Sequence, residues 1–260
     1  MTAPGGWRVR PGSPAEQFGR LMVAGLVVLF LPALPFGTYL AYPFVILTTW
    51  FHEMGHGLAA LAAGQDFRQL QIFANGSGVA QSAVAADAGA WVGMVIAAGG
   101  PLGPSVVGAA LILASARERF WRPALWLMAG AIMLSVVLYV RSATGLIVLP
   151  LVAGLLALLA ARGKPAMARF ALQFVGLLGA FSVVRDFDYL LTREAAVGGA
   201  VMLSDTGQMA AITGLPHWLW AGAIVAASAA LVGGALRYAL KERRPKPPAN
   251  VLQFKAGKRR

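Results

Sequence analysis

The sequence contains no cysteine among its 260 residues, and few of its residues are charged. The lack of cysteine excludes disulfide bonds and thiolate metal ligands, and it removes any indication of the redox state of the compartment. Charged residues make up 12% of the chain and hydrophobic residues 58%, whereas an ordinary soluble domain has roughly 25% charged residues. This composition argues against a soluble protein and indicates a chain that lies in a membrane.

Long apolar segments recur along the chain. A transmembrane helix needs about 20 predominantly apolar residues, and about 17 is the short limit. The segments are continuous rather than alternating in polarity, which excludes a transmembrane β-barrel. We therefore expect an all-α, multi-pass membrane protein with six or seven transmembrane helices. The apolar segments are residues 21–48, 89–114, 123–140, 145–161, 170–184 and 217–236.

The net charge of +12 is concentrated near the ends of the chain. We expect disordered basic tails over residues 1–20 and 241–260, on either side of a transmembrane domain over residues 21–240. Basic residues beside spans set the topology and attract anionic lipid headgroups, so we expect contact with the lipid bilayer and not with nucleic acid. The first apolar segment has no recognisable cleavage site after it, so we interpret it as a retained span. The sequence does not indicate an oligomeric state.

The basic segments present a conflict for the orientation of the chain. The positive-inside rule expects both tails and the loops 115–122 and 162–169 on the cytoplasmic side. Seven complete spans would instead place the two termini on opposite sides of the membrane. Either one segment enters and leaves on the same side, with 89–114 the first suspect, or one basic loop violates the rule.

Two stretches predict irregular structure near the membrane. In residues 64–88, "LQIF" and "GVAQSAV" flank "ANGS", and Asn75–Gly76 is a strong signal for a hairpin turn. This pattern predicts a short β-hairpin at one face of the membrane. Within residues 91–114, the glycines and prolines from Gly99 to Pro104 predict a broken or kinked helix.

The helix expected over residues 42–63 carries ionisable side chains within an apolar stretch, "TTWFHEMGHGLAALAAG". His52 and His56 are one turn apart on the same side of such a helix, so both can bind one ion. Zinc suits this arrangement, because it accepts imidazole ligands and a tetrahedral site with one open position. A bound zinc ion lowers the pKa of a water molecule, and Glu53 is placed to take its proton. This combination is typical of amide hydrolysis.

Chance, a structural role and a different hydrolase each account for this motif less well. His-Glu-x-x-His would arise by chance in on the order of one such chain in a thousand. A polar cluster could also join helices without a catalytic role, but ionisable residues in a span are costly and are usually functional. A membrane protein with a structural metal site, such as a transporter or an assembly factor, is the main alternative. A headgroup-modifying hydrolase would need basic side chains near the zinc, and few are present in the sequence.

The order of these motifs resembles the site-2 protease family of intramembrane zinc metallopeptidases, in particular its short bacterial branch without a PDZ domain. The resemblance covers about residues 45–110. An apolar residue before His-Glu-x-Gly-His, a helix of small residues, a glycine-rich hairpin and a Gly-Pro helix correspond to residues 51–56, 57–64, 72–82 and 98–104. The resemblance implies a zinc metalloprotease of the bacterial plasma membrane that cleaves membrane-protein substrates.

The resemblance also assigns roles to individual residues. His52 and His56 would be zinc ligands, Glu53 the catalytic base, and Gly55 a point of close helix packing. The hairpin would offer its edge to an unwound substrate. Strand addition makes physical sense here, because a helical substrate cannot be cut while its carbonyl groups are hydrogen-bonded.

The family has a third ligand, an aspartate on a later helix that is often followed by glycine, but none of the five aspartates here precedes glycine. Asp186 is the first candidate, because it lies in an apolar segment where a zinc ion would relieve the cost of a buried charge; the alternative is an ion pair with Arg185. Asp205, in "LSDTGQ", is the second, since the short branch tends to carry Ser-Asp here, although it could instead cap a helix. Asp188 is the third. His217, beside two tryptophans, is expected at the membrane interface.

Overall fold

The computed structural model describes residues 14–241, so most of the two predicted tails lie outside the described residues. Seven long helices form the body of the protein: α1 (Pro14–Phe30), α2 (Gly37–Ala62), α3 (Ala90–Ser115), α4 (Trp121–Leu138), α5 (Ala143–Arg162), α6 (Pro165–Arg185) and α9 (His217–Leu240). The short helices are α7 (Phe187–Leu191), α8 (Asp205–Thr213) and the 3-10 turns η1 (Leu31–Ala33) and η2 (Glu118–Phe120). The strands are β1 (Asp66–Ile72), β2 (Gly78–Ala83), β3 (Glu194–Val197) and β4 (Ala200–Leu203).

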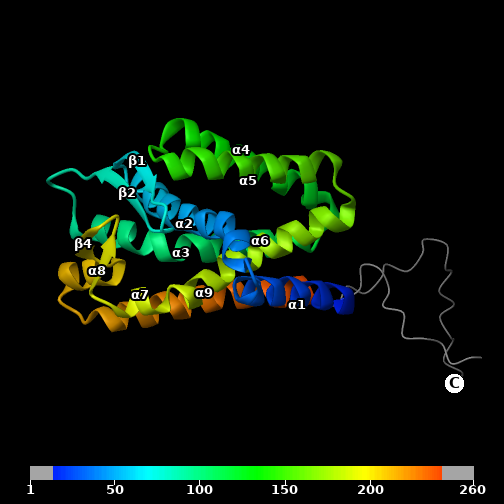
Figure 1. Ribbon diagram of the computed structural model, residues 1–260. Coiled ribbons are helices and arrows are strands. Elements are labelled where there is room, and N and C mark those ends of the chain that lie inside the picture. Colours follow the sequence, from blue (N-terminus) through cyan, green and yellow to red (C-terminus); the bar gives the residue numbers. More distant parts are fainter. Residues whose placement is uncertain (1–13, 242–260) are drawn as a thin grey trace, which may run out of the picture.

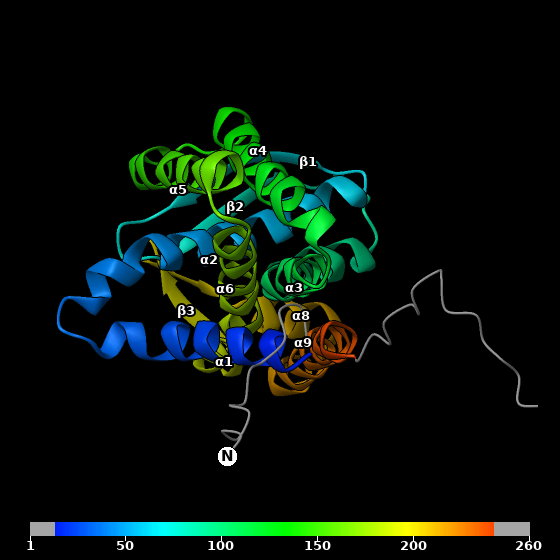
Figure 2. The same ribbon diagram turned by 90° about the vertical axis from the view of Figure 1, so that its right-hand side faces the viewer.

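The predicted fold class is confirmed. Six helical segments of the described chain are long and apolar enough to cross a membrane, and α2, which carries the ionisable motif, is not one of them. Helix α1 begins at Pro14, earlier than the first apolar segment at residue 21, and the turn at η1 separates it from α2. Figure 2 shows α1 and α2 running out to one side and meeting at this turn.

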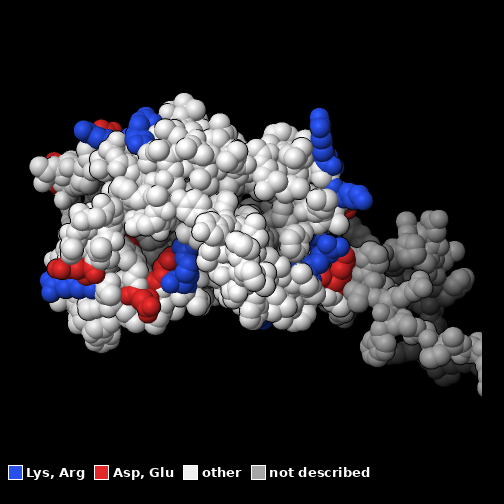
Figure 3. Space-filling model, viewed as in Figure 1, with Lys and Arg blue, Asp and Glu red and all other residues white. Residues whose placement is uncertain are grey.

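All the predicted basic loops lie at one end of the molecule. In Figure 1 both termini of the described chain lie at one end, and the β1–β2 hairpin and α8 lie at the other. Side chains join the loops at the first end, where Arg117 contacts Tyr238 and Arg122 contacts the carbonyl of Gly163. Figure 3 shows Lys and Arg at this end, a mixture of both charge signs at the other, and a broad uncharged region between them.

This arrangement resolves the conflict over orientation. Helices α1 and α2 together carry the chain from the basic end to the hairpin end, and α3, α4, α5, α6 and α9 each run between the ends (Figure 1). The suspicion that residues 89–114 are re-entrant is wrong, because α3 is a continuous helix with Pro101 and Pro104 inside it. The glycines and prolines predicted either a break or a kink, and the helix has no break at the Gly-Pro element.

Close packing against α3 fixes the position of α2. A Cβ atom on Gly55 would collide with the carbonyl oxygen of Gly99, and one on Gly103 would collide with the carbonyl oxygen of Phe51. The two backbones approach this closely because both helices have glycine at the contact, and the role expected for Gly55 fits this packing. Gly108 of α3 meets α6 in the same way, so α3 is the central helix of the bundle.

The predicted β1–β2 hairpin is confirmed. The strands pair antiparallel from Asp66 opposite Ala83 to Ile72 opposite Gly78. The turn lies at the expected place, where Gly76 has a φ of +86° and the Asn75 Oδ1 accepts a hydrogen bond of 3.0 Å from the backbone N–H of Ser77. Glycine fits this position because L side chains rarely adopt a positive φ.

The outer edges of the two strands in this hairpin have different surroundings: the edge of β1 is covered, and the edge of β2 is not. Leu70 of β1 donates its N–H to Tyr139 (2.8 Å) and accepts from Arg141 (2.9 Å), so the segment after α4 covers that edge. Leu70 therefore forms a non-hydrogen-bonded pair with Ala80, and the N–H and C=O groups of Ala80 point to the opposite edge. That edge of β2 has no strand partner among residues 14–241.

A second hairpin was not predicted. Strands β3 and β4 pair antiparallel around Gly198 and Gly199, which both have positive φ. A Cβ atom on Gly198 would collide with the ring of Phe73, so the tip of the second hairpin lies against the turn of the first. Residues 192–215 thus fold back over the end of the bundle as β3, β4 and α8.

Candidate metal centre

Three potential ligands from two distant segments converge at the hairpin end of α2. The Nε2 atom of His52 is 3.0 Å from Oδ2 of Asp205, and Nε2 of His56 is 3.2 Å from its Oδ1. These ligand atoms all lie within 4.8 Å of one another. Ligands of a tetrahedral zinc ion at 2.0–2.2 Å are about 3.4 Å apart, so the three atoms are spaced as for ligands of one ion.

The polar atoms of this group fit a cation between them. Asp205 is 2% exposed, and its Oδ2 makes no hydrogen bond among the described residues, although the imidazole of His52 lies beside it. A buried carboxylate oxygen without a hydrogen bond is costly, and a bound cation would remove that cost. Burial by itself would raise the pKa of the Asp205 carboxyl group, but the two imidazoles outweigh it and lower the pKa below its ordinary value. The donor set of two imidazoles and one carboxylate suits zinc.

Helix α3 orients one of the imidazoles. The Nδ1 atom of His56 is 2.7 Å from the carbonyl oxygen of Ile96 and donates its proton there, which directs Nε2 towards Asp205. A Cβ atom on Gly100 would collide with the His56 ring. Two glycines of the Gly-Pro element therefore leave room for different groups: Gly99 for the backbone of α2 and Gly100 for the imidazole of His56.

Asp205 is held at the first turn of α8 by its neighbours. Ser204, not Asp205, caps this helix, because the Ser204 hydroxyl accepts a hydrogen bond of 3.0 Å from the N–H of Gly207. The same hydroxyl donates to the carbonyl of Thr192 (2.5 Å), and the Thr206 hydroxyl donates to the carbonyl of Leu190 (2.8 Å). With the cap supplied by serine, the carboxylate of Asp205 is left to face the histidines.

The structure does not bring Asp186, the first candidate for the third ligand, to the two histidines. Helix α6 ends at Arg185, so Asp186 lies beyond it and not deep in the apolar segment. Its carboxylate pairs with Arg185 at 3.0 Å, and that guanidinium also donates to the hydroxyl of Thr48 at 2.7 Å. Asp188 is exposed on α7. His217 is also outside the group, with its Nε2 atom 2.9 Å from the carbonyl oxygen of Leu191.

The sequence did contain a signal for Asp205. It lies in the Ser-Asp element that made it the second candidate, between residues that cap and anchor α8. What the sequence did not show is that residues 192–215 return to the bundle, because that depends on packing between distant segments. The Gly-Gly pair at 198–199 between two short apolar runs was a recognisable hairpin signal.

Glu53 lies beside the metal-binding group and under the free edge of β2. It is 6% exposed, and a Cβ atom on Gly78 would collide with its side chain. The backbone of Ala80 also lies close to its carboxylate. Glu53 is therefore enclosed between its own helix and β2, one residue from His52.

A groove passes over this site between the two hairpins. Two adjoining cavities, of about 260 and 210 Å³, form this groove and meet at the site. One extends along β2 past Ser82 and Met202, and the other extends past Ser77 and Ala196 towards Arg185. The residues that line both cavities are His52, Glu53, Gly78, Tyr189 and Val197.

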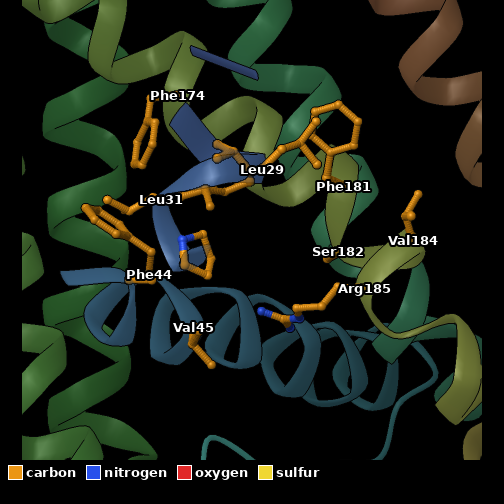
Figure 4. Close-up of a pocket in the computed structure, with 13 residues that line it drawn as sticks. Leu29, Leu31, Phe44, Val45, Phe174, Phe181, Ser182, Val184 and Arg185 are labelled. Carbon is orange, nitrogen blue, oxygen red and sulfur yellow. The ribbon is translucent and has the colours of Figure 1, made fainter. Parts of the chain in front are cut away.

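A separate apolar cavity of about 250 Å³ lies between α1, α2 and α6. Figure 4 shows its lining from α1, η1, α2 and α6, with Leu29, Phe44 and Phe181 around it and Arg185 at its margin. Arg185 also lines the smaller part of the groove. The guanidinium that pairs with Asp186 therefore stands between this apolar cavity and the candidate site.

Together, the fold and the site define a multi-pass α-helical membrane protein with a partly buried His-His-Asp group, a neighbouring glutamate and a groove along a strand edge. The family model described as Peptidase M50B-like matches residues 21–235, and the chain belongs to this family. The match includes both α2 and α8, and it confirms the resemblance to the site-2 proteases at family level. No curated protein and no solved structure was found to match the chain.

Proposed function

We propose that this protein is an intramembrane zinc metalloendopeptidase that cleaves peptide bonds of membrane-embedded substrates. The observation that carries the proposal is the convergence of His52, His56 and Asp205 beside Glu53, on a groove bordered by the free edge of β2. The three converging residues would hold the zinc ion. A structural metal site would be expected to have four protein ligands and no groove, whereas three candidates and a groove are present in the described chain.

The chain's own residues then have distinct tasks. A zinc ion, when bound, would polarise the scissile carbonyl group and lower the pKa of a water molecule. Glu53 takes a proton from the attacking water at its carboxylate and delivers it to the leaving amine. The carbonyl of Ile96 holds His56 in the tautomer that presents Nε2. The Ser204 and Thr206 hydroxyl groups keep α8, and with it Asp205, in place.

The free edge of β2 provides a means of holding the substrate. A transmembrane helix uses its own carbonyl groups for internal hydrogen bonds, so it must unwind before hydrolysis. The outward C=O group of Ala80 can pair with an extended chain, and the N–H group of Ala80 faces the carboxylate of Glu53. The β3–β4 hairpin forms the opposite wall, so the groove favours an extended segment over a helix.

The surroundings of the site fit a protein that works within the bilayer. Six apolar helices make it a multi-pass membrane protein, and its expected partners are membrane-protein substrates and lipid. By its resemblance to the short bacterial branch, we place it in a bacterial plasma membrane.

The test uses the full-length protein in lipid nanodiscs with a pool of synthetic transmembrane peptides that carry glycine or asparagine near one end. Mass spectrometry should detect cleavage by the wild type and none by Glu53→Gln, because the amide keeps the size of the side chain but cannot accept the proton. Both proteins should hold about one zinc ion per chain. Equal cleavage by the two proteins would exclude Glu53 as the base and favour a non-proteolytic metal protein.

A further inference from the structure

Tyr189 occupies a distinctive place in the groove. It belongs to α7, between the end of α6 and the second hairpin, and it lines both cavities that meet at the site. Five residues share this position, and after His52 and Glu53 the only polar side chain among them is that of Tyr189. A group placed there would face a substrate on either side of the scissile bond.

The surroundings of Tyr189 direct its hydroxyl group towards the reacting centre. Its ring lies 6.2 Å from the His52 ring, measured between centroids, at an interplanar angle of 75°. The hydroxyl is close enough to interact with both the carboxylate and the backbone amide of Asp205. The next residue, Leu190, is fully buried, and its carbonyl accepts the hydrogen bond from Thr206. Helix α7 is therefore tied to the start of α8.

Amide hydrolysis gains from a hydrogen-bond donor at the scissile carbonyl group, in addition to the zinc ion that would polarise it. The carbonyl oxygen gains negative charge as water attacks, and a correctly placed hydrogen-bond donor stabilises that charge. Other donors around the groove are engaged: the Thr49 hydroxyl donates to the carbonyl of Gly76 at 2.6 Å, and Arg185 is held by Asp186 and Thr48. Tyr189 is the hydroxyl-bearing residue that lines both cavities together with His52 and Glu53.

We propose that Tyr189 is a catalytic residue whose hydroxyl group donates a hydrogen bond to the carbonyl oxygen of the scissile peptide as that oxygen becomes charged. This inference rests on the proposed peptidase function. Tyr189 keeps its proton throughout, forms no covalent bond and takes no part in the proton transfer through Glu53. Its contribution is greater in the transition state than in the substrate complex, so it should affect kcat more than KM.

The test compares Tyr189→Phe with the wild type in nanodiscs, using a cleaved peptide from the transmembrane pool. We expect kcat to fall about 100-fold while KM changes less than about twofold, since loss of one such donor costs about 100- to 1,000-fold in kcat. Zinc content should stay the same. Affinity for a phosphinic peptide, which mimics the tetrahedral species, should fall by a similar factor as kcat. Tyr139→Phe is the matched control, because Tyr139 stacks on Phe67 away from the groove, and it should behave as the wild type.

Several results would overturn the inference. Unchanged kcat and unchanged phosphinic-peptide affinity in Tyr189→Phe would show that the hydroxyl is not used. Loss of zinc, or a raised KM with normal kcat, would show that Tyr189 positions Asp205 or binds substrate instead. If the Phe variant does not fold, Tyr189→Trp, which retains a donor, is compared with Tyr189→Leu, and equal kcat values for the two would count against the proposal.

The outcomes separate this inference from the proposed function. If the wild type cleaves none of the peptides, or if Glu53→Gln cleaves as fast as the wild type, both proposals fail together. If the wild type is active, Glu53→Gln is inactive and Tyr189→Phe matches the wild type, only the role of Tyr189 fails.

Discussion

At the residue scale, Asp205 and Asp186 share a side chain but differ in what surrounds it. Asp205 is buried against two imidazoles, with one oxygen lacking a hydrogen bond, whereas the carboxylate of Asp186 is neutralised by Arg185. Asp205 therefore lies where it could share a cation with the two imidazoles, and Asp186 does not. This contrast allows the third ligand to be tested with a pair of variants.

We expect Asp205→Ala to lose most of its zinc and Asp186→Ala to retain about one ion per chain. Removal of a direct ligand should cost more than the roughly 10- to 100-fold in affinity that follows the loss of a residue behind a ligand. Zinc would be measured by atomic emission after dialysis against a weak chelator. The opposite ranking of the two variants would restore Asp186 as the ligand.

Gly100 allows a test of the metal centre from the α3 side. Gly100→Ala should lower zinc affinity about 10- to 100-fold, because its Cβ atom would push the His56 imidazole away from Asp205. Gly130→Ala in α4 is the matched control, since a Cβ atom there meets nothing within 4 Å, and it should bind zinc normally. Chelator titration would measure both. Equal affinities would mean that the imidazole has room to move without leaving the metal.

The residues of the site were predictable to the extent that they are local. His52, Glu53 and His56 lie within little more than one helical turn, so their spacing alone places them together. The third candidate ligand, Asp205, comes from a segment that only tertiary packing brings back. Asp186 appeared deep in an apolar run because the sequence does not show that α6 ends at Arg185.

At the element scale, the two hairpins differ in how clearly the sequence marks them. Asn75–Gly76 between alternating strands is a strong turn signal, and β1–β2 forms as predicted. The strands of the second hairpin are four residues each and rich in alanine, which is a poor strand former. Its stability comes from contacts such as that between Gly198 and Phe73.

The free edge of β2 can be tested at one backbone group. Ala80→Pro removes an N–H that faces the groove and the Glu53 carboxylate, without removing a hydrogen bond between β1 and β2. We expect kcat/KM for a transmembrane peptide to fall at least about tenfold, which corresponds to the loss of one hydrogen bond of about 1.4 kcal/mol. Zinc content and thermal stability should be retained.

Val79→Pro is the control for that substitution. Val79 is the neighbour of Ala80 and pairs with Gln71, so its N–H faces β1 and its loss should weaken the hairpin itself. Hydrogen exchange of the β1 amides should be faster in Val79→Pro and unchanged in Ala80→Pro. Normal cleavage by a folded Ala80→Pro protein would argue against strand addition at this edge.

At the scale of the whole molecule, the directions of the helices place all the basic segments on one side of the membrane once α1 and α2 are counted as a single passage. The sequence showed two apolar helices there, and counting both as spans gave seven and a conflict. The turn at η1 and the inclined course of α2 are tertiary features, which the hydropathy pattern did not reveal (Figure 2). Six passages return the chain to the end at which it began.

The last prediction concerns orientation. At the end opposite the hairpins, residues 14–241 contribute nine basic side chains and two acidic ones: Arg20, Arg117, Arg119, Arg122, Arg162, Lys164, Arg169, Arg237 and Lys241 against Glu16 and Glu118. The positive-inside rule places this end in the cytoplasm, so the metal centre lies towards the non-cytoplasmic side. Alkaline phosphatase, which is active only outside the cytoplasm, should therefore be active when fused after Asp87 and inactive when fused after Glu118. A green fluorescent protein at the C-terminus should fluoresce. The reverse pattern would mean that the protein has the opposite orientation in the membrane, with the groove on the cytoplasmic side.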